Sequence, residues 1–65
     1  MNANLDELLD SQAVAKRLGV KIGTLEVWRC RGTGPTYVRV GRLPRYRVSD
    51  VEHYLQVRTV SPVTA

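Results

Sequence analysis

Cysteine, histidine and phenylalanine are almost missing from this sequence of 65 residues, which has one cysteine, one histidine and no phenylalanine. A lone cysteine cannot form an internal disulfide, and one cysteine with one histidine cannot supply the protein ligands of a structural zinc site. No apolar run approaches the roughly 18 residues of a membrane span. The first ten residues carry three acidic and no basic side chains, unlike a signal peptide. We therefore expect one small cytoplasmic domain with no metal, no disulfide and no membrane contact.

Groups that carry out catalysis are missing too. The sequence contains no cluster of paired carboxylates, no phosphate-binding glycine loop and no closely spaced cysteine and histidine. A chain of this length leaves little room for a concave pocket. We expect no enzymatic activity, no cofactor and no small-molecule ligand. His53 is interpreted as a surface histidine, and Cys30 as an incidental small residue, with a redox sensor as the alternative.

Positive charge is concentrated in the middle of the chain. Residues 16–47 contain nine basic side chains and one acidic side chain, Glu26, whereas the flanking segments are acidic. Seven of the nine are arginines, whose planar guanidinium groups suit phosphate binding. The segment favours a polyanionic partner such as double-stranded DNA. A charge run of this kind also fits a solvated surface, and that alternative stays open.

A first helix is expected over residues 11–18. Asp10 precedes it and can cap its free backbone N–H groups. Val14 and Leu18 stack four residues apart, which predicts a buried stripe along one face. Gly19 ends the helix, because glycine readily adopts the left-handed conformation found just past a last turn.

A second helix is predicted by the apolar period at Leu25 and Trp28, and it ends before Gly32. Lys21 stands at its start and cannot accept a backbone hydrogen bond, so we expect a weak beginning. Two helices joined by about three residues are typical of a helix-turn-helix, whose second helix lies in a DNA major groove. Any helical hairpin of a small core looks similar, and this reading remains the alternative.

Two strands are expected after the second helix, because alternation with period two follows a stretch of glycine and proline. They cover residues 37–40 and 45–48, and residues 41–44 form a four-residue loop. The alternation predicts one apolar face and one cationic face. The apolar face is assigned to Val38, Val40, Tyr46 and Val48, and the cationic face to Arg39, Arg45 and Arg47.

A third helix is expected from the segment Ser49 to Glu52, which matches a capping box with Ser49 as the cap. Its buried stripe is assigned to Val51, Tyr54, Leu55 and Val57. Residues 58–65 show no period, and Pro62 stops any helix there. We therefore divide the chain into one domain, residues 1–57 with a short acidic lead, and a mobile tail, residues 58–65.

The order of these elements resembles that of the small winged-helix DNA-binding proteins of the phage excisionase and MerR-like type. The resemblance covers residues 8–57 and implies an α+β fold, a small winged helix-turn-helix with two short helices, a two-stranded wing hairpin and a third helix. It rests on Leu9-Asp10, Ala13-Val14-Ala15, Leu18-Gly19-Val20, Thr24-Leu25 with Trp28, Arg31-Gly32-Thr33-Gly34-Pro35, the stretch Tyr37 to Arg42, and Tyr46-Arg47 before Ser49-Asp50-Val51.

The resemblance also implies where DNA is bound. The second helix enters the major groove, and the hairpin, called the wing, lies against the DNA backbone or reaches the adjacent minor groove with Arg42. Leu25 and Trp28 face inward, which leaves Glu26 and Val27 outward. The candidate contacts are Lys21, Gly23, Thr24, Glu26, Val27, Arg29 and Arg31 on the recognition helix, Arg39, Arg42, Arg45 and Arg47 on the wing, and Lys16 and Arg17 as further phosphate contacts.

The function implied by this resemblance is that of an excisionase, a recombination directionality factor. Such proteins bind and bend phage attachment-site DNA in a bacterial host cell, and they help to recruit a tyrosine-type integrase. The long dimerising helix of MerR regulators does not fit in residues 58–65, so we expect copies lying next to one another on DNA. The alternatives are a small phage or plasmid transcriptional regulator and, in another class, a protein-interaction adaptor with a basic face.

Overall fold

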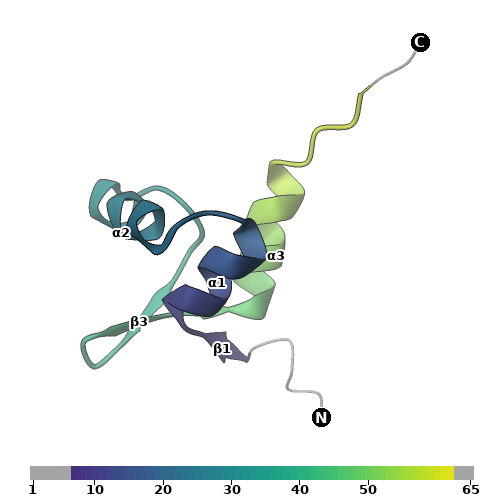
Figure 1. Cartoon of the computed structure of the whole chain (residues 1–65). Coiled ribbons are helices and arrows are strands. Elements are labelled where there is room, and N and C mark those ends of the chain that lie inside the picture. Colours follow the sequence, from purple (N-terminus) through teal and green to yellow (C-terminus); the bar gives the residue numbers. More distant parts are fainter. Residues whose placement is uncertain (1–6, 63–65) are drawn as a thin grey trace.

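The computed structural model describes residues 7–62, which form three helices and a small antiparallel sheet (Figure 1). In chain order the elements are β1 (Leu8–Leu9), α1 (Ser11–Leu18), α2 (Ile22–Arg31), β2 (Val38–Val40), β3 (Leu43–Arg47) and α3 (Val48–Val57). This is the α+β winged helix-turn-helix arrangement that was predicted, with one additional strand. No helix in residues 7–62 is long and apolar enough to cross a membrane.

The first helix and its two ends agree with the prediction. The backbone N–H of Ala13 donates to Oδ1 of Asp10 at 2.8 Å, so Asp10 is the N-cap of α1. Gly19 has a φ of 73°, and its N–H donates to the carbonyl of Lys16 at 3.2 Å. The left-handed glycine turns the chain sharply, so that α2 begins after only three residues.

The second helix begins without a side-chain cap, as its sequence predicts. Lys21 is the N-cap residue, and its side chain makes no capping hydrogen bond. At the other end Gly32 has a φ of 73°, and the N–H of Thr33 donates to the carbonyl of Trp28 at 2.8 Å. The stability of α2 must therefore come from its packing against the rest of the domain.

A strand that was not predicted from the sequence, β1, joins the sheet at its edge. β1 pairs antiparallel with β3, with Leu8 opposite Arg47 and Leu9 opposite Tyr46, and the strand order is β1-β3-β2. The N–H of Val48 also donates to the carbonyl of Glu7 at 3.0 Å. The residues just before α1, assigned to an acidic lead, therefore hold β3 in place. Residues 1–6 lie outside the described residues.

The hairpin has a shorter turn than predicted. Val38 lies opposite Arg45 and Val40 opposite Leu43, so that only Gly41 and Arg42 connect the strands. Gly41 has a φ of 62°, and no residue other than glycine has a positive φ in the described part of the chain. A positive φ at the first turn position alone is the pattern of a type II′ turn, whose twist matches that of the two strands.

The predicted division of the hairpin into two faces was wrong. Directly paired residues point to the same face, and this register places Arg45 with Val38, whereas Arg39 shares a face with Tyr46. When the turn has two or four residues, each even-numbered residue of one strand lies opposite an odd-numbered residue of the other. Val38 and Tyr46 both have even numbers, so they point to opposite faces in either case. Val40, predicted to be buried, is 50% exposed.

The third helix begins one residue before the predicted cap. α3 starts at Val48, Arg47 is its N-cap without a side-chain capping bond, and Ser49 lies inside the first turn. The prediction of Ser49 as the cap is therefore wrong. Asp50 lies in the first turn of α3, near the positive end of the helix dipole, and its Oδ2 accepts a hydrogen bond from Nη1 of Arg47 at 3.3 Å. Because β3 runs directly into α3, the sheet fixes where this helix begins.

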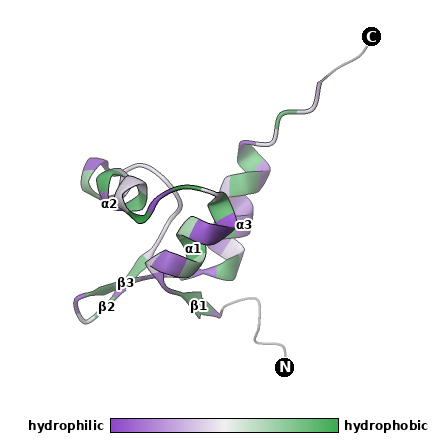
Figure 2. Ribbon diagram, viewed as in Figure 1, coloured by the Kyte–Doolittle hydropathy of each residue, from purple (hydrophilic) through white to green (hydrophobic). Residues whose placement is uncertain are grey.

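The hydrophobic core lies where α1, α2, α3 and the inner face of the sheet meet. The buried side chains of this core cluster are Val14, Ala15, Leu25, Tyr46 and Val51, and the partly buried ones packed against them are Leu9, Leu18, Val20, Ile22, Trp28 and Tyr37. The helices carry hydrophobic residues next to hydrophilic ones, as expected when one face of each is buried (Figure 2).

The end of α3 extends past this core. Leu55 and Val57, both assigned to the buried stripe, are 40% and 61% exposed. Past the helix, the guanidinium of Arg58 stacks over the ring of Tyr54 at 4.0 Å. The expectation of a mobile tail over residues 58–65 falls in part on residues 63–65, which lie outside the described residues.

Candidate nucleic-acid interface

The exposed face of α2 is small, partly apolar and carries one carboxylate. Its exposed residues are Gly23, Glu26, Val27, Cys30 and Arg31. Val27 is 46% exposed, although it is an aliphatic side chain in the middle of the helix. The Glu26 carboxylate takes part in none of the side-chain hydrogen bonds or ion pairs of residues 7–62. This face can present an acceptor and methyl groups to a partner. Thr24, another predicted contact, is half-buried at its flank.

Arg29, predicted to contact DNA, points into the domain instead. Its Nη1 donates to the hydroxyl of Tyr46 at 2.9 Å and to Oγ of Ser11 at 3.2 Å. Its guanidinium also lies 5.9 Å from the centre of the Tyr37 ring. Arg29 follows Leu25 by four residues, so both lie on the buried face of α2. This spacing was the signal in the sequence that could have identified its role.

Arg29 therefore joins α2 to the base of the wing. Tyr46 lies in β3 and Ser11 begins α1, so one guanidinium connects three elements. The rings of Tyr37 and Tyr46 pack against each other with centroids 5.8 Å apart. Tyr37 immediately precedes β2, so this pair of rings attaches the other strand of the hairpin as well. These contacts set the position of the wing relative to α2.

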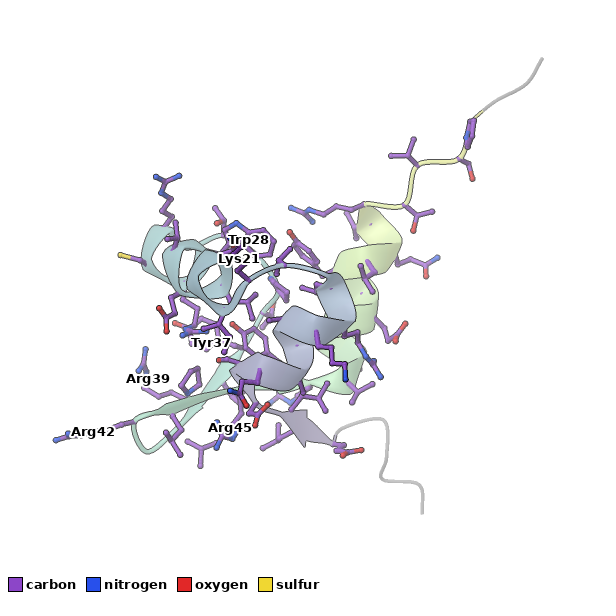
Figure 3. The ribbon with its side chains drawn as sticks, in the orientation of Figure 1. Lys21, Trp28, Tyr37, Arg39, Arg42 and Arg45 are labelled. Atoms are coloured by element: carbon purple, nitrogen blue, oxygen red, sulfur yellow. The ribbon has the colours of Figure 1, made fainter. Side chains whose placement is uncertain are left out.

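The wing presents two of its arginines to the solvent, one at its tip and one on the side of α2. Arg42 lies at the turn and projects from the tip of the hairpin, while Arg39 lies on the side that faces α2 (Figure 3). The guanidinium of Arg39 is 6.0 Å from the centre of the Tyr37 ring. Neither arginine forms an ion pair with a carboxylate of the described residues. Both guanidinium groups can therefore bind phosphate.

The other two predicted wing contacts lie elsewhere. Arg45 lies on the opposite side of the hairpin from Arg39, is half-buried, and donates from Nη1 to the carbonyl of Pro44 at 2.9 Å (Figure 3). Arg47 lies at the base of the wing and pairs with Asp50 at 3.3 Å. The structure thus separates the four wing arginines into two pairs, because strand alternation and the short turn send neighbours to different sides.

The two basic residues of α1 also differ. Nη1 of Arg17 lies 3.1 Å from Oε2 of Glu52 on α3, and both side chains are well exposed, so the pair contributes little to stability. Lys16 is exposed and forms no ion pair among residues 7–62. Arg17 faces α3, whereas α2 and the wing project from the other side of the body (Figure 1).

Five basic side chains are exposed and have no carboxylate partner in the described part of the α1, α2 and wing region. They are Lys16, Lys21, Arg31, Arg39 and Arg42. We call them the free cations. All of them except Lys16 belong to α2, to the residue before it or to the wing, the two elements that project from the same side of the body (Figure 1). This arrangement is suited to a rod of negative charge with two accessible grooves.

The aromatic residues of this region serve packing. Trp28 is half-buried, and its ring centroid lies 5.9 Å from that of Tyr54. Gly34 fits closely against it, since a Cβ at Gly34 would lie 2.8 Å from Cε3 of Trp28. Trp28 is therefore held on both sides, as expected for a core residue. Cys30 and His53 are exposed, and no group of three or more metal-ligating side chains occurs within residues 7–62.

Residues 8–59 match a protein family described as a helix-turn-helix domain. The match begins at β1 and ends two residues past α3, so it includes both short helices, the wing and the third helix. No curated protein matches the chain.

Proposed function

Because the chain belongs to the helix-turn-helix domain family and is a DNA-binding protein of that class, we propose that it is an excisionase that binds phage attachment-site DNA. In this role α2 enters the major groove, and the wing follows the sugar-phosphate backbone to the adjacent minor groove. Several copies bind next to one another, bend the DNA and help to recruit a tyrosine-type integrase. The observation that carries the proposal is the connection of α2 to the wing through Arg29, Tyr46 and Tyr37.

This connection matters because two grooves must be contacted at once. A wing that moved freely relative to α2 would lose conformational entropy on binding, and a rigid pair avoids that cost. The free cations then supply most of the affinity by replacing counterions along the DNA backbone. Arg29, Arg45, Arg47 and Arg17 are left out of the proposed contact set, because their guanidinium groups have partners within the domain or face away from α2.

Salt dependence of binding is the direct test of this charge assignment. Five phosphate contacts predict a slope of about −4.5 in a plot of log affinity against log salt concentration. Arg42→Ala should make the slope less steep by about one unit, because one phosphate contact is lost. The variant should keep its fold, because Arg42 is an exposed turn residue. Arg58→Ala is the matched control, since Arg58 stacks on Tyr54 past the end of α3. Equal slopes for both variants would remove Arg42 from the interface.

The excisionase role needs a second experiment. The purified protein is titrated onto attachment-region DNA and onto scrambled DNA in a gel shift at two salt concentrations. A ladder of cooperative shifts on the attachment DNA alone supports the proposal, and the absence of binding to either DNA favours the adaptor. Deletion of the gene then distinguishes an excisionase, whose loss abolishes excision of the prophage, from a transcriptional regulator, whose loss changes transcript levels only.

A further inference from the structure

The exposed face of α2 lacks, except at its last residue, the side chains that read purine bases in the major groove. An arginine, lysine, asparagine or glutamine is needed to read a purine through two hydrogen bonds in the major groove. Among the exposed residues of α2, only Arg31 is of this kind, and it is the last residue of the helix. Arg29, the other arginine, is held inside the domain by Tyr46 and Ser11. The centre of this face therefore has no side chain suited to read guanine or adenine in this way.

The central exposed residues are instead an acceptor and an aliphatic group. The Glu26 carboxylate accepts hydrogen bonds and donates none, and cytosine is the base that presents only a donor, N4, in the major groove. Val27 is next to Glu26 and 46% exposed, so its methyl groups can contact the C5 methyl of thymine. Gly23 lies one turn earlier on the same face, and a Cβ added there would have no atom within 4 Å, which leaves the backbone open to close approach.

The ends of α2 allow this acid to lie near DNA. Lys21 precedes the helix and Arg31 ends it, so at 1.5 Å per residue the two cations lie about 15 Å apart along the helix. The major groove is about 12 Å wide, so a helix of this length can reach the phosphates at both walls. Glu26 is five residues from each cation, so the proposed insertion of α2 would place it over the base edges rather than beside the phosphates.

We infer that α2 selects a cytosine through Glu26 and a neighbouring thymine through Val27. This inference rests on the proposed insertion of α2 into the major groove, and it assigns a base preference to that same contact. The carboxylate repels phosphate wherever no cytosine N4 is present. Glu26 thus lowers affinity for unrelated DNA while it favours the correct site, which gives specificity by rejection as well as by attraction.

Selection of sites from a random DNA library tests the inference. The wild-type protein should enrich a cytosine next to a thymine. Glu26→Gln should enrich adenine at the cytosine position, since a glutamine pairs with adenine, and discrimination between the two bases should change by about fivefold or more. The same variant should bind random DNA about threefold to tenfold more tightly, because a negative charge has been removed. Glu7→Gln is the matched control, since Glu7 is exposed and precedes β1.

The proposed contact between Val27 and thymine is tested by removing the C5 methyl group of the thymine. Replacing the selected thymine by uracil removes its C5 methyl and should weaken wild-type binding about threefold to tenfold. The replacement should have no effect on Val27→Ala. A loss of equal size in both proteins would overturn the Val27 assignment.

The possible failures are distinguishable. If Glu26→Gln and the wild type enrich the same bases, α2 does not read through Glu26, and the base preference is overturned while DNA binding stands. If the wild type binds DNA and enriches no sequence, the base preference is likewise overturned. If the wild type binds no DNA at all, the proposed function fails together with the inference.

Discussion

The contact between Arg29 and Tyr46 gives the strongest prediction about this fold. Replacing Arg29 by methionine keeps the aliphatic stem and removes the guanidinium, which donates to the hydroxyl of Tyr46 at 2.9 Å and to Ser11 at 3.2 Å. The Tyr46 side chain is only 1% exposed. Its hydroxyl therefore loses its partner in a place that water reaches poorly.

The expected cost follows from that burial. A buried polar group without a hydrogen bond costs about 1–3 kcal/mol. A domain of this size has a total stability of roughly 3–10 kcal/mol, so the loss is a large fraction of it. A change of about 2 kcal/mol corresponds to a fall in Tm of about 8–16 °C for a small domain. Tyr46→Phe should cost less, because Arg29 is half-buried and can turn its guanidinium to water.

A double-mutant cycle provides the measurement. Thermal and urea unfolding are followed by circular dichroism for the wild type, Arg29→Met, Tyr46→Phe and the double variant. Once the guanidinium is gone, removing the hydroxyl should cost little or should restore stability. We expect the double variant to be more stable than the sum of the single costs predicts, by about 1 kcal/mol or more.

Two results would refute this reasoning. Costs that add to within about 0.5 kcal/mol would show that the two groups do not interact. An unchanged Tm in Arg29→Met together with a large loss of DNA affinity would show that Arg29 binds DNA, as the sequence first suggested. Arg31→Met, which removes an exposed guanidinium from the same helix, serves as the control for the change of charge.

Two glycine substitutions should have opposite effects on stability. Gly23→Ala should stabilise the protein by about 0.5–1 kcal/mol, because Gly23 lies inside a helix and nothing lies within 4 Å of an added Cβ. A fall in Tm would contradict this. Gly34→Ala should destabilise by about 2 kcal/mol or more, since Gly34 has a φ of 85° and the added Cβ would lie 2.8 Å from Cε3 of Trp28. Urea unfolding measures both, and a Gly34→Ala variant as stable as the wild type would show that the Trp28 contact is loose.

Most of the helical structure was predictable because its signals are local. Asp10, Gly19 and Gly32 act on the backbone within one turn of themselves, and each lies where its conformation requires it. Ser49 was misleading, since a capping box is also a local signal but β3 leads directly into α3. The pairing of the preceding strand fixed the start of that helix and overruled the local preference.

The sheet was predicted less well because pairing joins distant residues. β1 is only two residues long, and Leu8 and Leu9 become a strand only because β3 offers free backbone groups beside them. The faces of the hairpin were assigned wrongly, although turns of two and of four residues both place Val38 opposite an arginine, Arg45 in the first case and Arg47 in the second. Gly41, with its positive φ, was the residue that pointed to the shorter turn.

The structure separates the predicted contact residues into exposed side chains and side chains with partners inside the domain. Sequence placed positive charge on α2 and the wing, and Lys21, Arg31, Arg39 and Arg42 are exposed there. The sequence did not show which arginines form hydrogen bonds or ion pairs within the domain. All four arginines lie in the same basic segment of the sequence. In the structure, however, Arg29 donates to Tyr46 and Arg47 pairs with Asp50, whereas Arg31 and Arg42 are exposed without a carboxylate partner.

By itself, the sequence of this protein determined the two helices of the helix-turn-helix, the presence of a hairpin and the sign of the charge on it. Caps, glycines and apolar periods act over a few residues, so they can be read in order along the chain. Only the tertiary structure decided the orientation of each arginine and the attachment of the wing to α2. Those depend on which groups meet across the core, as Arg29 meets Tyr46 from a position 17 residues away in the chain.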